Sequence, residues 1–331
     1  MQVVITGAAG MLGLKLVRAI LAKGTLAGPD GAQVAVDKIV ATDIVANPEM
    51  PTDGRVAFVA GDVFDPGLIR RLVTPGTGSI FHLAGVVSAG AERDFDLGYR
   101  VNLDGHRVVL EAARALGSCP RVVFASSLAA YGGDLPETIT DEQKLTPQTS
   151  YGVQKVIGEL LTMDYTRKGF VDGRSLRLPT IVVRPGKPNL AASTFASSII
   201  REPLKGERAT CPVDPSAMMP LLSPRLCIEA FVRAHELPGA EWGWNRSLML
   251  PSLDMSVAEM ADGLKRVAGQ KAHDLIDWKP DAMIAKIVAG WPKRLASKRA
   301  RAMGFRSDAS MDAIIQAFIE DDLPAAKRAA G

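Results

Sequence analysis

The sequence predicts a doubly wound α/β fold, in which helices cover both faces of a parallel sheet. In the first half of the 331-residue chain, short runs rich in β-branched residues alternate with segments of helical periodicity. Most of these runs are apolar throughout, as expected for strands that are buried on both faces of a sheet. The second half lacks this alternation, and we expect it to form a smaller C-terminal α/β lobe.

The elements of the first half can be assigned in chain order. The predicted strands are Gln2–Thr6, Lys38–Asp43, Val56–Val59, Ser79–Ala84, Arg121–Ser126 and Leu178–Val183. The predicted helices between them are Met11–Lys23, Pro66–Leu72, Arg93–Leu116 and Tyr151–Lys168. The polar segment Gly24–Asp37 is interpreted as a surface loop. Alternation of strands and helices in this order predicts a doubly wound α/β sheet.

The second half begins with residues 184–224, which are rich in Pro, Ser and Met and show no clear period. The predicted elements after it are a helix over Pro224–Leu237, a strand over Arg246–Leu250, and helices over Ser256–Ala268, Pro280–Ala289 and Ser310–Asp321. We therefore assign residues 1–185 to one domain, to which residues 215–238 are expected to return. Residues 186–331 are assigned to the smaller lobe.

Charge, cysteine and histidine content narrow the function. The net charge of +3 indicates no polyanionic partner. The basic residues near the C-terminus (Lys293, Arg294, Lys298, Arg299 and Arg301) could bind nucleic acid, but a solvated helix face is favoured because no aromatic residues lie among them. The three cysteines are widely spaced, which suits a reducing compartment and suggests no disulfide framework. The four histidines form no close pair, so we expect no metal.

The N-terminal segment is apolar, but it does not have the form of a signal peptide. Gly7, Gly10 and Gly13 interrupt it, and Lys15 and Arg18 lie inside it. No apolar stretch approaches the roughly 20 residues of a membrane span. We expect a cytoplasmic protein that does not cross a membrane.

A glycine-rich turn follows the first predicted strand. Gly7, Gly10 and Gly13 occur where that strand meets the first helix. Such glycines permit a tight turn, close approach of the backbone to a pyrophosphate, and close packing of helix on strand. The first helical residues, Met11 and Leu12, would present free N–H groups to phosphate. The placement predicts a dinucleotide-binding Rossmann-type domain, although the glycines alone could serve only a turn.

Asp43 ends the second predicted strand, where a carboxylate can accept both ribose hydroxyls of adenosine and repel a 2′-phosphate. This favours NAD over NADP. Other candidates for cofactor contact follow the third and fourth strands, namely Asp62, Val63, Leu83, Ala84 and Gly85. Asn102 lies within a predicted helix, where its low helix propensity suggests a specific hydrogen bond. His82 is interpreted as a packed strand residue, because it precedes the end of its predicted strand.

The pattern from Tyr151 to Lys155 carries the predicted chemistry. A spacing of four on a helix puts both side chains on one face. A tyrosine hydroxyl has a pKa near ~10, too high for a base at neutral pH, and a neighbouring ammonium is expected to lower that pKa. Ser126 and Ser127 follow the fifth strand, where a hydroxyl can hold a substrate oxygen. An exposed helical pair and two turn serines would be the structural alternative.

These residues together resemble the extended short-chain dehydrogenase/reductase family, which is also the NAD-dependent epimerase/dehydratase family, over roughly residues 1–186. The resemblance implies that Tyr151 is the general acid or base, that Lys155 also binds the nicotinamide ribose, and that NAD is the cofactor. Because the family's serine lies four positions before Tyr131, it selects Ser127 as the catalytic hydroxyl. Pro185, after the sixth predicted strand, is expected to contact the cofactor. Family members dimerise through two helices, here the predicted helices 93–116 and 151–168.

The sequence after the sixth predicted strand differs from the corresponding sequence of the family's nucleotide-sugar enzymes. Residues 185–189 and 195–204 are instead similar to the D-erythronate dehydrogenase branch, whose members oxidise a four-carbon sugar acid at C2 to the 2-oxo acid with NAD. Lys187, Arg201 and Arg225 could pair with the carboxylate of such a substrate. Ser88, Asn189 and Ser193 could bind its hydroxyls. For any single one of these residues, a surface charge or loop role is the alternative.

Two other functions remain open on sequence grounds. A nucleotide-sugar epimerase or dehydratase would hold NAD tightly and show no net reduction of it. A non-catalytic NAD-binding protein would have no need of a proton-transfer group, so the intact pair of Tyr151 and Lys155 argues against it. The sequence therefore predicts an NAD-dependent oxidoreductase that acts on a small sugar acid.

Overall fold

The computed structural model describes residues 1–186 and 192–323 and divides into two compact units. The first unit comprises residues 1–130, 147–177 and 228–249, and the second comprises residues 131–146, 178–227 and 250–331. The division differs from the predicted boundary at 185. Residues 131–146 and 178–185 belong to the second unit, and the return to the first unit begins at 228 rather than 215.

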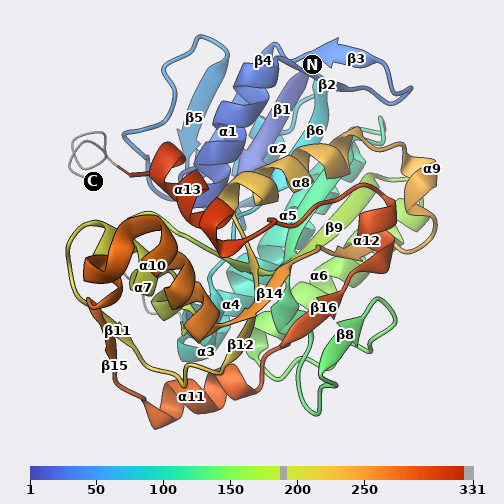
Figure 1. Cartoon of the computed structure of the whole chain (residues 1–331). Coiled ribbons are helices and arrows are strands. Elements are labelled where there is room, and N and C mark those ends of the chain that lie inside the picture. Colours follow the sequence, from blue (N-terminus) through green and yellow to red (C-terminus); the bar gives the residue numbers. More distant parts are fainter. Residues whose placement is uncertain (187–191, 324–331) are drawn as a thin grey trace. The chain divides into compact units, whose positions relative to one another are not determined.

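A parallel sheet of seven strands forms the centre of the first unit, in the order β13-β9-β7-β6-β1-β4-β5. The strands are β1 (Gln2–Thr6), β4 (Lys38–Asp43), β5 (Val56–Ala60), β6 (Thr77–His82), β7 (Arg121–Ser127), β9 (Asp172–Leu178) and β13 (Ser247–Met249). All neighbouring pairs run parallel. The predicted α/β class with a doubly wound sheet is thereby confirmed. Figure 1 shows β1, β4, β5 and β6 in the blue and cyan part of the chain.

The sixth strand of this sheet is not the predicted segment 178–183, which was wrong. β9 ends at Leu178, and β10 (Thr180–Ile181) pairs with a strand of the second unit. The strand β9 was missed because it carries two arginines. Both are buried, since Arg174 forms an ion pair with Asp172 and Arg177 forms one with Glu159. Ion pairing lets charged residues occupy a central strand that hydropathy alone excludes.

Helices cover both faces of this sheet. The side chains of α2 (Pro66–Leu72), α5 (Gly105–Ala115) and α6 (Ser150–Arg167) share one core cluster with Val4, Ile80 and Val122. On the other face lie α1 (Met11–Lys23) and the first unit's part of α8 (Pro224–Glu236), where His235 stacks on Phe81. A short helix of this unit, α9, spans Gly239–Trp242.

The predicted helix over 93–116 is divided into several pieces. They are α3 (Ser88–Arg93), α4 (Phe95–Tyr99), a π-helical turn over Arg100–Asp104, and α5. The break occurs at Asp94, whose side chain accepts from the Leu97 backbone N–H at 2.9 Å and so begins a new helix.

The segment 24–37 was predicted as a surface loop, and this was wrong. It forms a hairpin of β2 (Thr25–Ala27) and β3 (Gln33–Ala35). Leu26 is fully buried, and the Ala27 carbonyl accepts from the Arg121 guanidinium at 2.8 Å. The polar composition reflects the exposed strand β3, while β2 packs inward.

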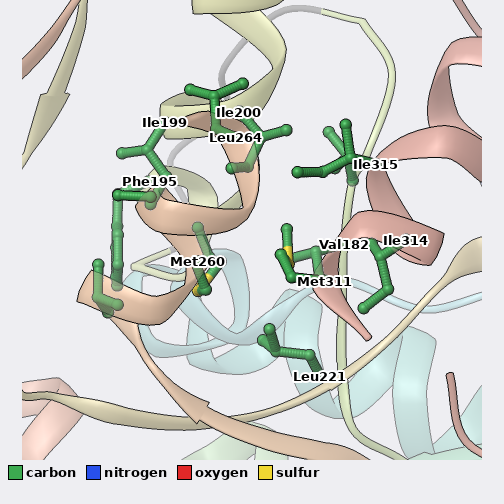
Figure 2. Packing of buried hydrophobic residues seen from close by; sticks show 14 of the residues in the cluster. Val182, Phe195, Ile199, Ile200, Leu221, Met260, Leu264, Met311, Ile314 and Ile315 are labelled. Carbon is green, nitrogen blue, oxygen red and sulfur yellow. The ribbon is translucent and has the colours of Figure 1, made fainter. Parts of the chain in front are cut away.

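The second unit is built from short strands and helices around its own core. It has a three-stranded sheet in the order β10, β12 (Met218–Leu222), β14 (Leu253–Ser256). Its two-stranded sheets are β11 (Ala209–Cys211) with β15 (Ile276–Trp278), and β8 (Thr138–Thr140) with β16 (Arg294–Ala296). Its other helices are α7 (Thr194–Leu204), α10 (Val257–His273), α11 (Ala282–Ala289), α12 (Lys298–Ala302) and α13 (Met311–Asp321). Figure 2 shows how Phe195, Met260 and Ile314, from three of these helices, meet in one apolar cluster.

Candidate functional site

The predicted cofactor residues of the first unit gather at one edge of the sheet. All strands run parallel, so the loops that follow β1, β4, β5, β6 and β7 lie at the same carboxyl edge, which is where ligands bind in such folds. The loop after β5 contributes Asp62, whose side chain is exposed. Val63 follows it, but its side chain is buried in the core, so only its backbone is available to a ligand.

The glycine loop after β1 is packed too tightly for side chains. Gly7 has a φ of 70°, and a Cβ there would come within 2.6 Å of the Ala84 nitrogen. A Cβ on Gly13 would come within 2.1 Å of the Gly7 carbonyl oxygen. Helix α1 begins at Met11 with Gly10 before it, and no side chain caps its N-terminus. Its first N–H groups therefore fit a phosphate anion.

Asp43 connects the end of β4 to this loop. Its carboxylate accepts from the backbone N–H groups of Ala9 at 3.0 Å and Ile44 at 2.8 Å. Asn47 donates to the Ala9 carbonyl at 2.8 Å and so holds the loop from the same side. A carboxylate has about four acceptor positions, so Asp43 can still accept from ribose hydroxyls. Together with the glycine loop, this arrangement fits the adenosine and pyrophosphate portions of NAD.

Asn102 makes the specific hydrogen bonds that its place in a helical segment suggested. Its side-chain oxygen accepts from the Val86 N–H at 2.8 Å, and its amide group donates to the Val86 carbonyl at 3.0 Å. The amide also donates to the buried Gln154 on α6 at 2.7 Å. Asn102 thus ties the loop after β6, which contains Leu83, Ala84 and Gly85, to the helix that carries Tyr151.

The side chains of Tyr151 and Lys155 lie on one face of α6, as the spacing predicted. The Lys155 ammonium lies 5.4 Å from the centre of the Tyr151 ring and donates to the Ala125 carbonyl on β7 at 2.8 Å. Ser127, at the end of β7, forms a hydrogen bond with the Tyr151 hydroxyl. Three side chains that were singled out from separate segments therefore meet at one point.

The expectation that Lys155 lowers the pKa of Tyr151 is wrong for the protein alone. Burial raises the pKa of Tyr151 to about 12, and the hydrogen bond with Ser127 acts in the opposite direction without overcoming burial. Burial is therefore the dominant cause, while the Lys155 ammonium donates to a backbone carbonyl on β7. Burial also lowers the pKa of Lys155 to about 8, against which the Glu159 carboxylate raises it.

A buried ionic cluster that the sequence analysis missed lies next to this site. The Glu159 carboxylate accepts from the Ser126 hydroxyl and, at 2.6 Å, from the Arg177 guanidinium. The sequence held one signal for Glu159, since it follows Lys155 by four residues and so shares its helix face. No local signal connected Arg177 to it, because that contact joins a helix to a different strand.

Both histidines near Lys155 are packing residues. His82 and His106 are buried and stack with ring centres 5.0 Å apart. Burial lowers the pKa of His82 well below its ordinary value, and burial lowers the pKa of His106 to about 3. This agrees with the interpretation of His82 as a packed strand residue. Ser88, a predicted substrate residue, begins α3 and is half-buried.

Two arginines that were predicted to bind the substrate carboxylate already have carboxylate partners. Arg201 on α7 is buried and forms a bidentate pair with Glu202. Arg225 on α8 pairs with both Glu320 and Asp321. Their charges are balanced within the second unit, so neither is available in the way we expected. The sequence held a signal for the ion pair of Arg201, because Glu202 is the next residue. It held none for Arg225, because only the fold brings α13 to it.

The remaining predicted residues lie around the start of α7. Ser193 precedes that helix, and its hydroxyl accepts from the Arg184 guanidinium at 3.1 Å. Arg184 itself forms no ion pair among the described residues, and Pro185 follows it half-buried. Lys187 and Asn189 lie outside the described residues. Within the described ranges, no cluster of His, Cys, Asp and Glu could hold a metal, and no helix is long and apolar enough to cross a membrane.

The model of the family described as "NAD dependent epimerase/dehydratase family" matches residues 3–242. The chain belongs to this family. Two curated relatives share nearly the whole length. The D-erythronate dehydrogenase of Cupriavidus necator is 53% identical over 97% of this chain and 98% of its own. The D-erythronate dehydrogenase of Haemophilus influenzae is 42% identical over 98% of this chain and 100% of its own.

Solved structures agree with this membership of the NAD-dependent epimerase/dehydratase family. The crystal structure of a nucleoside-diphosphate-sugar epimerase from Agrobacterium tumefaciens has a TM-score of 0.92 and 44% identity, covering 98% of this chain and 94% of that one. The family places the glycine loop, Asp43 and the residues near Tyr151 in the setting of an NAD-dependent enzyme.

Proposed function

We propose that this protein is an NAD-dependent dehydrogenase that oxidises D-erythronate at C2 to 2-dehydro-D-erythronate, the 2-oxo acid. The observation that carries the proposal is full-length similarity to two D-erythronate dehydrogenases, at 53% and 42% identity. The arrangement of Ser127, Tyr151 and Lys155 supports it, because a proton acceptor beside a hydroxyl-binding serine is what alcohol oxidation requires.

In this proposal, Tyr151 takes the proton of the C2 hydroxyl. When bound, NAD⁺ supplies both the hydride acceptor and a second positive charge beside Tyr151. That charge favours the phenolate, and the effect is needed because burial alone raises the pKa of Tyr151 to about 12. Ser127 holds the same substrate oxygen and already hydrogen-bonds the phenol.

Lys155 would hold the nicotinamide ribose and supply a fixed positive charge next to Tyr151. The glycine loop and the N-terminus of α1 would hold the pyrophosphate, and Asp43 would accept from the adenosine ribose. Asn102 would shape the loop of Leu83 to Gly85 against the cofactor. A carboxylate at Asp43 selects NAD, because a 2′-phosphate would meet its negative charge.

We propose that Arg184, in place of Arg201 and Arg225, binds the substrate carboxylate. Burial lowers the pKa of Arg184, and the nearby charge of Arg201 lowers it further. Such a cation gains from an anion that approaches it, and a guanidinium binds a carboxylate through two hydrogen bonds. Ser193, at 3.1 Å from it, would bind a hydroxyl of the same small molecule.

A direct assay tests the proposed function. The enzyme is mixed with NAD⁺ and D-erythronate, and the absorbance at 340 nm is followed. We expect steady NADH formation, with little activity on NADP⁺. A panel of four-carbon sugar acids serves as the control for substrate identity. Absence of turnover with every acid in the panel would refute the proposal.

The second candidate is a nucleotide-sugar epimerase, which the similarity to the Agrobacterium tumefaciens protein favours. Such an enzyme would keep its NAD bound and release no NADH. Incubation with nucleotide-diphosphate sugars, followed by chromatography of the sugars, distinguishes the two. Epimerised product without a change at 340 nm would support the second candidate.

We also propose that the protein acts as a homodimer in the cytoplasm. The dimer would form through α5 and α6, and α6 presents Leu160 to solvent with 53% of its surface exposed. Light scattering after size-exclusion chromatography measures the mass in solution. A mass equal to one chain at micromolar concentration would contradict the dimer.

A further inference from the structure

The inference concerns the ionic cluster beside Lys155, whose members come from three neighbouring elements. Glu159 lies on α6, Arg177 on β9, and Ser126 on β7. The Arg177 Nε donates to the Glu159 carboxylate at 2.9 Å, and a terminal nitrogen of the same guanidinium donates at 2.6 Å. Glu159 is 3% exposed, so this bidentate pair is shielded from water.

The ionic cluster is connected to the catalytic residues Ser127 and Lys155 by adjacent positions in the chain and by hydrogen bonds. Ser126 donates to Glu159, and the next residue is Ser127. The Ala125 carbonyl, on the other side of Ser126, accepts from Lys155. Two consecutive residues of β7 are therefore bonded to two residues of α6 that lie one helical turn apart. These two contacts fix how far α6 can slide along β7, and hence where Tyr151 meets Ser127.

The charge of Glu159 also acts on Lys155. Lys155 is only 3% exposed, and no carboxylate lies within 4 Å of it among the described residues. The other titratable groups facing it are Tyr151 on its own helix, His82 on β6 and His106 on α5. Burial lowers the pKa of both histidines, with a smaller contribution from the Lys155 ammonium, and a neutral imidazole offers that ammonium no negative charge. Glu159 is the negative group that raises the pKa of Lys155 against burial.

We propose that Glu159 is a positioning residue for the reaction. Arg177 and Ser126 hold its carboxylate in place. Glu159 in turn fixes α6 on β7 and keeps Lys155 as an ammonium beside Tyr151. The proposal rests on the proposed function only for the role of Lys155. Glu159 acts through Lys155 and Ser126, and it has no contact with the reacting atoms in this scheme.

The test is Glu159→Gln, which keeps the size of the side chain and removes its charge. In the intact enzyme, kcat/KM for D-erythronate and the Kd of NAD⁺ are measured from pH 6 to pH 9. Lys155 should lose its proton at lower pH in the variant. We expect the alkaline fall in kcat/KM and the weakening of NAD⁺ binding to move down by about one pH unit, with a loss of about fivefold at pH 8 and less at pH 6.5.

Two further variants separate charge from position. Ser126→Ala removes the bond to β7 but keeps the charge, so its rate should fall severalfold while the alkaline limb stays at the wild-type pH. Asp164→Asn removes an exposed acid from the same helix, where it pairs with Arg167, and should change neither rate nor pH profile. The proposal would be overturned if kcat/KM of Glu159→Gln were reduced by the same factor at every pH, or were not reduced at all.

Two safeguards keep the outcome interpretable. If Glu159→Gln does not fold because Arg177 is left unpaired, the double variant with Arg177→Met removes both charges and should show a smaller shift of the alkaline limb in the same direction. If D-erythronate is not the substrate, the wild-type enzyme shows no turnover, and the pH profile of NAD⁺ binding still reports on Lys155. An unshifted binding profile in the double variant would refute the proposal independently of the substrate.

Discussion

Lys155 of the first unit and two arginines of the second unit differ in whether an acid neutralises them. In the first unit, Lys155 lies beside Tyr151, has no ion-pair partner within 4 Å among the described residues, and remains available at the sheet edge. In the second unit, Arg201 and Arg225 are neutralised by acids of that same unit. Within the described part of the chain, Lys155 thus has no acidic partner within 4 Å, whereas Arg201 and Arg225, which look equally suited to an anionic ligand in the sequence, are occupied. The difference teaches that a cation's function depends on whether the fold supplies its counter-charge.

The largest expected effect tests whether the chemistry belongs to the first unit. Tyr151→Phe removes the proton acceptor and leaves the ring packing. We expect kcat to fall by about 10³-fold, while the Kd of NAD⁺ changes by less than about threefold. Stopped-flow detection of NADH and a fluorescence titration with NAD⁺ measure the two quantities. Activity within tenfold of the wild-type enzyme would contradict the assigned role.

The second effect concerns the buried pair in the second unit. Glu202→Gln leaves the Arg201 guanidinium buried without its carboxylate. We expect the free energy of unfolding to fall by about 3 kcal/mol, as measured by urea denaturation. Asp321→Asn at the partly exposed Arg225 provides the matched control and should cost less than about 1 kcal/mol. Equal losses in the two variants would remove the distinction between buried and surface neutralisation.

A smaller effect distinguishes free from occupied arginines. Arg184→Met removes the described arginine that we propose for the substrate carboxylate, so the KM for D-erythronate should rise by about 30-fold, with kcat changed much less. Arg225→Met is the control, and we expect its KM to stay within about twofold of the wild-type value. Steady-state kinetics at saturating NAD⁺ measure both. A larger rise in the control than in Arg184→Met would reverse our reading of the second unit.

A further expected effect is an acid sensitivity confined to the first unit. His82, His106 and His235 all belong to it, and burial lowers the pKa of each. Below their unfolded pKa of about 6.5, the unfolded chain binds protons that the folded chain does not. Stability is therefore fully present above that pH and is lost as the pH falls toward the folded values, by up to about 1.4 kcal/mol per pH unit for each histidine.

Regional hydrogen exchange between pH 7 and pH 5 tests this effect. Amides of β6, α5 and the first unit's part of α8 should exchange faster as the pH falls, after correction for the intrinsic rate. His82→Gln should flatten the dependence in the first unit and leave α10 and α13 unchanged. Equal acid sensitivity of both units would show that the buried histidines are not its cause.

The comparison also explains what could be predicted from the sequence. Features with fixed local geometry were found correctly, such as the strand β1, the helix α1 and the shared helix face of Tyr151 and Lys155. Features that depend on distant partners were not. The charged strand β9 needs Glu159 from α6 in order to be buried, and Arg225 needs α13. Neither partner lies within a window that periodicity can examine.

The residues of the candidate site also include some whose contacts could be predicted from the sequence and some whose contacts could not. Asn102 was selected because an asparagine in a helix needs a reason, and its three hydrogen bonds supply that reason. The pKa of Tyr151 was misjudged because burial of the phenol, which raises that pKa, depends on the fold around α6. Spacing predicts which side chains share a face, but it does not predict to which atom a flexible side chain turns.

The seventh strand, β13, has a consequence for synthesis of the protein. It spans Ser247–Met249 and covers the edge of β9, which otherwise ends the sheet. A nascent chain that has emerged only to residue 185 has made six of the sheet's strands and leaves the backbone of β9 unpaired. Exposed strand edges invite pairing between chains. Translation of the next sixty or so residues is therefore the interval in which aggregation on the ribosome is most favoured, and a chaperone that binds extended backbone would act there.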